Sequence, residues 1–140
     1  MKKLLIIPLL ALFIVTGMTC RPLDPGADPF VVRVEQSQTV ANATFDFVLN
    51  LDQSNRPFWR TNAPAFHQFC EWLRTPQKYG TNTVPRAVLI ELNVSDLKLA
   101  YKASRTSGNS NALWSAWSVL NQAIIQSTSW SNIVTTPTHP

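Results

Sequence analysis

Glycine is scarce in this chain, which has only four glycines among its 140 residues. They lie far apart, at Gly17, Gly26, Gly80 and Gly108. Loops that cradle a phosphate need closely spaced glycines, so the scarcity excludes nucleotide binding through such a loop. The chain also lacks the Gly-x-Ser-x-Gly elbow of hydrolases and the His-Glu-x-x-His helix of zinc proteases.

Charged side chains are also few, with 12 Lys and Arg against 8 Asp and Glu. The formal net charge is +4, and Lys2 and Lys3 supply two of these charges, which leaves +2 for the remainder (4 − 2). No segment gathers basic residues, so the electrostatic footprint of a nucleic-acid-binding protein is missing. From Thr106 to Pro140, only His139 can carry a charge.

Metal-ligating residues are equally sparse. Structural zinc sites need four cysteine or histidine ligands, and the chain has only Cys20, His67, Cys70 and His139. Two of these four lie near the chain termini. We therefore expect no metal site and no cofactor.

The first residues form an export signal. Lys2 and Lys3 are followed by an apolar run from Leu4 to Val15 that only Pro8 interrupts. This run is shorter than the ~20 residues that cross a bilayer. We predict a signal peptide over residues 1–19 and an exported protein of the cell envelope, either lipid-anchored or periplasmic.

Cys20 follows this signal, and two interpretations stay open for it. In the first, Cys20 is the lipidated first residue of a lipoprotein and attaches the protein to the membrane. In the second, ordinary cleavage leaves Cys20 free to pair with Cys70 in an oxidising compartment. The lipoprotein pattern has an aliphatic residue where this chain has Gly17. We favour lipidation, because the apolar run ends at Cys20 and a Pro/Asp/Gly-rich tether over residues 20–30 begins there.

Residues 31–128 have the length of one domain and the apolar spacing of helices. Residues 30–34 are typical of a short strand or an extended lead-in. The segment Gln36–Asn55 is predicted as a helix, although residues 43–51 also alternate as a strand does. A second helix starts near Asn62 and stops at Pro76, and residues 77–82 are predicted as a loop.

A third helix is predicted from Thr83 to Ser104. It has two apolar stripes on opposite sides, which is typical of a central helix covered by neighbours on both sides. The last helix is predicted over Asn111–Thr128, with Trp114 and Ile125 widening its apolar face, and residues 129–140 as a flexible tail. These elements make an all-α fold, a small helical bundle of about four helices after the signal and tether.

The order of several segments carries a resemblance. These segments are Thr44–Asp46, Asp52–Arg56, Phe66–Arg74 and Ala100–Arg105. In this order the chain resembles a group of small exported α-helical proteins, lipoproteins among them, from bacterial and phage genomes. The resemblance covers about residues 30–128. It implies a helix over Gln36–Asn55 and implies no activity and no functional residue.

His67, Cys70 and Glu71 are the one local cluster with chemical potential. Their spacings of three and four place them on adjacent turns of one helix. A catalytic interpretation makes Cys70 a nucleophile, His67 its base and Glu71 the group that orients the ring. We favour a structural interpretation, because Cys70 falls within an apolar stripe formed by Phe66, Phe69 and Leu73.

The segment from Arg56 to Arg60 holds the candidate binding residues. Phe58 and Trp59 lie in a connection between two arginines, and aromatic rings beside cations can grip a sugar, a headgroup or a protein. The alternative, which we favour, is that they brace the turn between the first two helices.

The sequence thus predicts a non-enzymatic, envelope-located helical domain that binds or packs against another envelope component, with an envelope protein as the candidate partner. One alternative is a small periplasmic hydrolase that uses Cys70 and His67 or a dispersed pair of carboxylates. A second alternative is a phage-encoded accessory of lysis or exclusion. The polar face of the last helix carries only hydroxyls and amides, and we favour an ordinary solvated surface without salt bridges for it. The alternative is a packing face, because amides and hydroxyls lose water at lower cost than charges.

Overall fold

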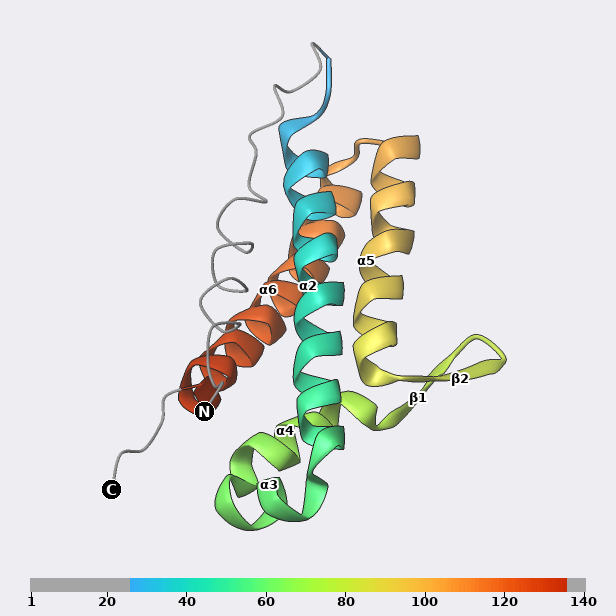
Figure 1. The fold of residues 1–140 in the computed structure, drawn as a ribbon. Coiled ribbons are helices and arrows are strands. Elements are labelled where there is room, and N and C mark those ends of the chain that lie inside the picture. Colours follow the sequence, from blue (N-terminus) through green and yellow to red (C-terminus); the bar gives the residue numbers. More distant parts are fainter. Residues whose placement is uncertain (1–25, 136–140) are drawn as a thin grey trace.

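The computed structural model describes residues 26–135, and the side chains up to Trp130. The predicted signal peptide, Cys20 and His139 lie outside this part. The described chain contains five helices and one two-stranded hairpin, so the all-α prediction is confirmed (Figure 1). In order, the elements are α2 (Pro29–Ser54), α3 (Arg56–Asn62), α4 (Pro64–Arg74), β1 (Pro76–Tyr79), β2 (Asn82–Pro85), α5 (Arg86–Ala103) and α6 (Ser107–Thr135). None of these helices has the length and hydropathy needed to span a membrane.

Helix α2 begins earlier than the sequence predicted. Asp28 caps it by accepting a hydrogen bond from the Phe30 backbone N–H at 2.9 Å, and Pro29 is tolerated in the first turn. Residues 30–34 are therefore helical, and the predicted strand or extended lead-in was wrong. The side chains that α2 buries recur at helical spacing, which resolves residues 43–51 as helix: Val31, Val34, Ala41, Phe45, Val48 and Asp52.

The predicted second helix is α4, and the predicted connection before it contains a further short helix, α3. Asn55 ends α2 and starts α3, and its side chain accepts from the Phe58 backbone N–H. Pro57 and Pro64 each lie in the first turn of a new helix, where a missing N–H costs no hydrogen bond. The chain therefore turns twice within a few residues.

The predicted loop over residues 77–82 belongs to an antiparallel hairpin, in which Pro76 pairs with Pro85 and Tyr79 with Asn82. Its turn contains Gly80 at φ 58°, a conformation that glycine adopts without strain. Because β2 uses residues 82–85, helix α5 starts at Arg86 rather than at Thr83.

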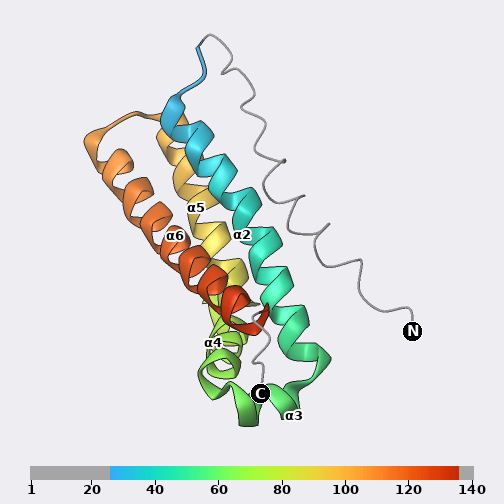
Figure 2. The ribbon, with the colours of Figure 1, turned by 60° about the vertical axis from the view of Figure 1, so that its left-hand side comes forward.

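Helix α5 is not central, contrary to our expectation from its two stripes. It buries Ala87, Ile90 and Val94 on one side, whereas Val88 and Leu99 of the other stripe are exposed. Helix α6, and not α5, is the helix that packs extensively against two neighbours, α2 and α5 (Figure 2). It also continues to Thr135, so residues 129–135 of the predicted tail are helical.

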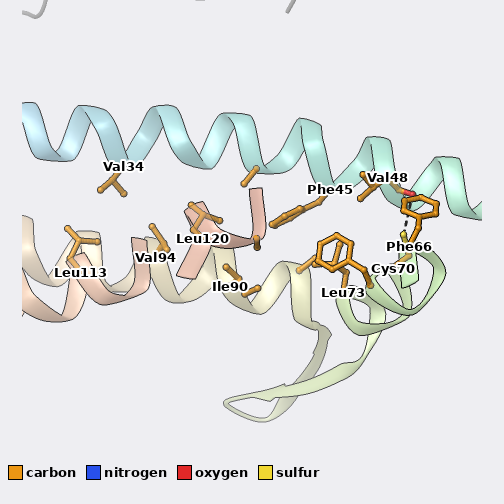
Figure 3. Close-up of a cluster of buried hydrophobic side chains, with 14 residues drawn as sticks. Val34, Phe45, Val48, Phe66, Cys70, Leu73, Ile90, Val94, Leu113 and Leu120 are labelled. Atoms are coloured by element: carbon orange, nitrogen blue, oxygen red, sulfur yellow. Dashed lines mark hydrogen bonds between the residues drawn. The ribbon is translucent and has the colours of Figure 1, made fainter. Parts of the chain in front are cut away.

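The core lies where α2, α5 and α6 meet, and it continues between α2 and α4 (Figure 3). Phe45 and Val48 of α2 face Phe66 and Leu73 of α4 at one end of this core, and Cys70 lies among them. Helices α3 and α4 and the hairpin lie at the opposite end of α2 from Pro29 (Figure 1). The charged residues described next belong to this α3–α4 end.

Candidate functional site

A buried carboxylate organises the α3–α4 end. Asp52 lies in the last turn of α2 with none of its surface exposed. Its Oδ1 is 2.7 Å from His67 Nδ1, and its Oδ2 accepts from Arg74 Nη1 at 2.5 Å. Arg56 Nε lies 3.9 Å from Oδ2. A buried charge is costly unless it is paired and hydrogen-bonded, and these three cationic or polar partners meet that requirement.

Two arginines link Asp52 to a second carboxylate. Glu71 Oε1 accepts from Arg56 Nη2 and, at 2.9 Å, from Arg74 Nη1. Arg74 also donates from Nη2 to the Leu49 carbonyl at 2.8 Å. Burial alone would lower the pKa of Arg74, but its hydrogen bonds to Asp52 and Glu71 raise that pKa above the ordinary value. We call these five side chains the Asp52 cluster: Asp52, Arg56, His67, Glu71 and Arg74.

The partner of His67 differs from the one that the sequence suggested. Asp52, and not Glu71, holds the imidazole ring, while Glu71 pairs with the arginines. Sequence reasoning missed Asp52, although a signal was present. Asp52 follows Phe45 and Val48 at spacings of three and four, which continues the buried stripe of α2.

Cys70 is a core residue, as predicted. It is fully buried, and its thiol donates a weak hydrogen bond to the Val48 carbonyl, with Sγ and the oxygen 3.6 Å apart. Desolvation, and then the negative charge of Asp52, raises the pKa of the Cys70 thiol to about 12. A thiol that stays protonated at neutral pH is a poor nucleophile, so Cys70 is unsuited to the catalytic role.

Asp52, His67 and Glu71 bring three ligand atoms within 4.8 Å of one another, a spacing that a metal ion could use. The same carboxylate oxygens already accept hydrogen bonds from Arg56 and Arg74. A cation in this place would have to displace two guanidinium groups. The chemistry of the cluster therefore fits ion pairing better than metal binding.

Glu91 and Asp46 are the other carboxylates that approach each other, from α5 and α2. Desolvation raises the pKa of Glu91, and the negative charge of Asp46 raises it further. Neither residue lines the groove or the notch described below.

Trp59 supports the bracing interpretation of the Arg56–Arg60 segment. Its indole Nε1 donates to the Leu51 carbonyl at 2.9 Å, and its ring meets Phe66 edge-on at 5.4 Å between centroids. Phe58 packs against Trp59 but stays half exposed. Trp59 thus fastens α3 to α2 and to the core.

Two hollows lie at this end of the molecule. One is a notch of about 160 Å³ lined by Arg56, Pro57, Arg60 and His67. The other is an open groove of about 370 Å³ between α4 and α6, in which Phe69, Trp72 and Trp130 are the aromatic walls. The indole Nε1 of Trp130 is buried there, and no hydrogen-bond partner for it exists among the described residues.

A different kind of surface runs along α6. Its 29 residues include no Asp, Glu, Lys, Arg or His. Trp114, Val119 and Ile125 are 57%, 51% and 68% exposed, so Trp114 and Ile125 do not widen the buried stripe as predicted. The exposed polar side chains of α6 are Ser107, Asn111, Ser115, Gln122, Gln126, Thr128 and Ser129.

Helix α2 extends this surface. The rings of Trp114 and Phe30 have their centroids 5.8 Å apart, and Trp117 Nε1 donates to Ser37 Oγ at 2.9 Å. These contacts hold α6 beside α2, and both helices run in the same direction (Figure 2). Val40 and Phe47 are exposed and seven residues apart, and Val40 lies one turn beyond Ser37. Helical spacing therefore places them beside the exposed side chains of α6.

We call this surface the α2–α6 face. It comprises the exposed side chains of α6 together with Val40 and Phe47 of α2. Arg33 lies seven residues before Val40 and marks the end of the face near Pro29. All other charged side chains of the described chain lie elsewhere on α2, in α3–α5, in the hairpin, at Asp28 before α2 or at Arg105 after α5.

Comparison with known proteins gives no relative from which a role could be carried over: no family model, curated protein or solved structure matches this chain. The functional argument therefore rests on the residues of this chain alone.

Proposed function

We propose that this chain is a non-enzymatic helical domain of the cell envelope, anchored by lipid at Cys20, that packs against an envelope protein through the α2–α6 face. The observation that carries the proposal is the separation of charge. A 29-residue helix without a charged side chain exposes three large apolar residues, while the charged residues gather on other elements.

The chemistry of the face suits a protein partner. Amides and hydroxyls lose water at a cost of about 1–3 kcal/mol each when unpaired, whereas an unpaired buried charge costs far more. Exposed tryptophan is also the type of residue that anchors protein interfaces. A face of this composition attracts neither anionic lipid nor nucleic acid, because it offers no cluster of cations.

The size of the face is sufficient for a specific complex. At 1.5 Å per residue, α2 and α6 are each about 40 Å long, and two adjacent helices are about 20 Å wide. Their shared face therefore covers about 800 Å², which is the area that each partner of a standard protein–protein complex buries.

The anchor fits this arrangement. Residues 21–28 lie between Cys20 and the start of α2, and an extended chain of that length spans less than about 30 Å. Both α2 and α6 begin at this end of the bundle (Figure 2). A lipid at Cys20 would hold the face within reach of proteins in the same membrane.

A matched pair of charge insertions tests the proposal. Gln122 and Asn93 are exposed amides in the middle of α6 and α5, and arginine is a good helix former at either place. Gln122→Arg would bury a charge in the complex and should weaken co-purification with the partner from detergent-solubilised envelopes at least about tenfold, which corresponds to ~1.4 kcal/mol. Asn93→Arg should leave co-purification unchanged.

An equal effect of both substitutions, or loss only with Asn93→Arg, would contradict the use of the α2–α6 face. The anchor is tested separately. Cys20→Ser should move the protein from the membrane fraction to the soluble fraction, and mass spectrometry of the wild-type N-terminus should find an acylated Cys20. An unmodified Cys20, or a disulfide with Cys70, would refute the lipid anchor without touching the claim about the face.

A further inference from the structure

The notch at the α3–α4 end is separate from the α2–α6 face, because none of its lining residues belongs to α2 or α6. It is lined by Arg56, Pro57, Arg60 and His67 and has a volume of about 160 Å³. Three of these four side chains can carry a positive charge. The question is which of these charges are already compensated by carboxylates.

Counting the charges around the notch leaves one cation over. Asp52 and Glu71 supply two negative charges, and Arg56 and Arg74 bind both of them. Arg60 has no carboxylate within ion-pair distance among the described residues. The notch and the cluster behind it therefore have a net charge of +1 with His67 neutral, and +2 with His67 protonated.

His67 adds a ring nitrogen to the lining of the notch. Asp52 Oδ1 lies 2.7 Å from Nδ1 and, as a carboxylate oxygen, accepts a hydrogen bond from it. Nδ1 therefore carries a proton in both the neutral and the charged ring. The second ring nitrogen, Nε2, is an acceptor in the neutral ring and a donor in the protonated ring. Only the protonated ring can donate a hydrogen bond to an anion in the notch.

We infer that this notch binds a small tetrahedral oxyanion, the phosphate or sulfate class, between the guanidinium of Arg60, a free Nη of Arg56 and Nε2–H of His67. Guanidinium groups match such oxyanions in charge and in the geometry of their paired N–H donors. Glu71 holds Arg56 in place, and Asp52 holds His67, so two of the three donors are positioned before the anion arrives.

The same chemistry could come from a free anion or from the headgroup of a phospholipid. Helix α2 separates the notch from the start of the bundle by 26 residues, or about 39 Å. With the chain attached to a membrane near Pro29, the notch would face away from that membrane. A free anion is therefore the source that the arrangement favours.

Titration calorimetry at low salt tests the inference, with sodium sulfate and inorganic phosphate as probes. Arg60→Gln removes a cation that has no carboxylate partner, so the fold should remain intact. It should weaken sulfate binding about tenfold or more, the effect of ~1.4 kcal/mol. Lys78→Gln removes an equal charge from the hairpin and should change the affinity by less than about twofold.

The role of His67 is tested by His67→Asn. The asparagine side-chain N–H can replace Nδ1–H as the donor to Asp52, but it leaves no nitrogen at the place of Nε2. This substitution should weaken sulfate binding about tenfold or more, the effect of ~1.4 kcal/mol. An unchanged sulfate affinity would remove His67 from the site and overturn the three-donor arrangement.

Two further outcomes decide the source and the site. If Arg60→Gln weakens binding to vesicles of anionic phospholipid while free phosphate does not bind, the oxyanion belongs to a headgroup and the notch still recognises it. If Arg60→Gln and Lys78→Gln reduce binding equally, or if neither probe shows any effect of Arg60→Gln, the inference is overturned. Failure here leaves the α2–α6 face untouched, because Gln122→Arg tests that face independently.

Discussion

Removing the charge of Asp52 tests whether the Asp52 cluster holds the α3–α4 end together. Asp52→Asn keeps the size of the side chain but leaves only one oxygen for the partners at 2.5 Å (Arg74) and 2.7 Å (His67). A hydrogen bond to a charged group contributes about 1.5–3 kcal/mol. Arg56 Nε lies 3.9 Å from Asp52, and the Arg56 side chain is more than one third exposed. This ion pair therefore contributes less than ~1 kcal/mol to the free energy of unfolding.

Loss of one charged hydrogen bond, together with an Arg74 that is only 25% exposed and keeps Glu71 as its only carboxylate partner, gives a destabilisation of about 3 kcal/mol. Urea unfolding followed by tryptophan fluorescence measures it. Asp46→Asn, an exposed residue of the same helix, is the control and should change stability by less than ~0.5 kcal/mol. A double variant Asp52→Asn/Arg74→Gln should lose less than the sum of its two single variants.

Equal stabilities of Asp52→Asn and Asp46→Asn would refute the reasoning, because the loss of a fully buried carboxylate with three partners must lower the stability of the fold. Strict additivity in the double variant would also refute it, since it would show that Asp52 and Arg74 do not interact.

The remaining predictions concern the buried thiol of Cys70, the carboxylate of Glu91 with its raised pKa, and the contact of Trp59 with α2. Cys70→Ala should cost about 1–2 kcal/mol, and iodoacetamide should label Cys70 quickly only in denaturant; rapid labelling of the native protein would restore the thiol as a nucleophile. The raised pKa of Glu91 means that ionisation of Glu91 destabilises the fold, so Glu91→Gln should be more stable than wild type at pH 7. This gain should vanish below pH 4.5, where Glu91 is protonated in the unfolded chain as well. A gain independent of pH would show that ionisation of Glu91 is not what destabilises the fold. Trp59→Phe removes the hydrogen bond to the Leu51 carbonyl and should lower the free energy of unfolding in urea by about 1 kcal/mol. No loss of stability would show that Trp59 does not brace the fold.

Periodicity in the sequence was enough to predict the four longer helices but not α3, because burial of one face is a local property that only a helix of several turns displays. Phe66, Phe69, Cys70 and Leu73 recur at spacings of three and four, and all four are buried. The same spacing led to the wrong conclusion for Val88 and Leu99. Apolar residues on two sides of α5 do not show which side a neighbour covers, and in this fold only one side is covered.

Short elements were harder to predict, because their signals are those of loops. Residues 76–85 contain two prolines and a glycine, and they form two strands of four residues that pair only with each other. The start of α2 was missed for a related reason. Val31, Val32 and Val34 favour strands intrinsically, but the Asp28 cap and the burial of Val31 and Val34 against the bundle outweigh that preference.

The candidate site was predicted only in part. His67, Cys70 and Glu71 were recognised as neighbours on one helix, but their partners come from α2 and α3, which are 15 to 22 residues away in the sequence. The packing of α4 against α2 brings these groups together, and no local spacing encodes it. The uncharged length of α6, in contrast, was visible in the sequence, and the structure adds that Trp114 and Ile125 are exposed on it.

The most direct test of the proposed role compares two exposed aliphatic positions of nearly equal exposure, Ile125 on the α2–α6 face at 68% and Leu99 on α5 at 64%. A photo-crosslinking amino acid is placed at each position in turn in otherwise wild-type protein, and intact cells are irradiated. We predict one discrete crosslinked product from position 125, with a mass that fits a different protein, and no such product from position 99. Equal crosslinking from both positions, a product from position 99 alone, or a product of twice the chain's own mass from position 125 would contradict docking of an envelope protein on the α2–α6 face.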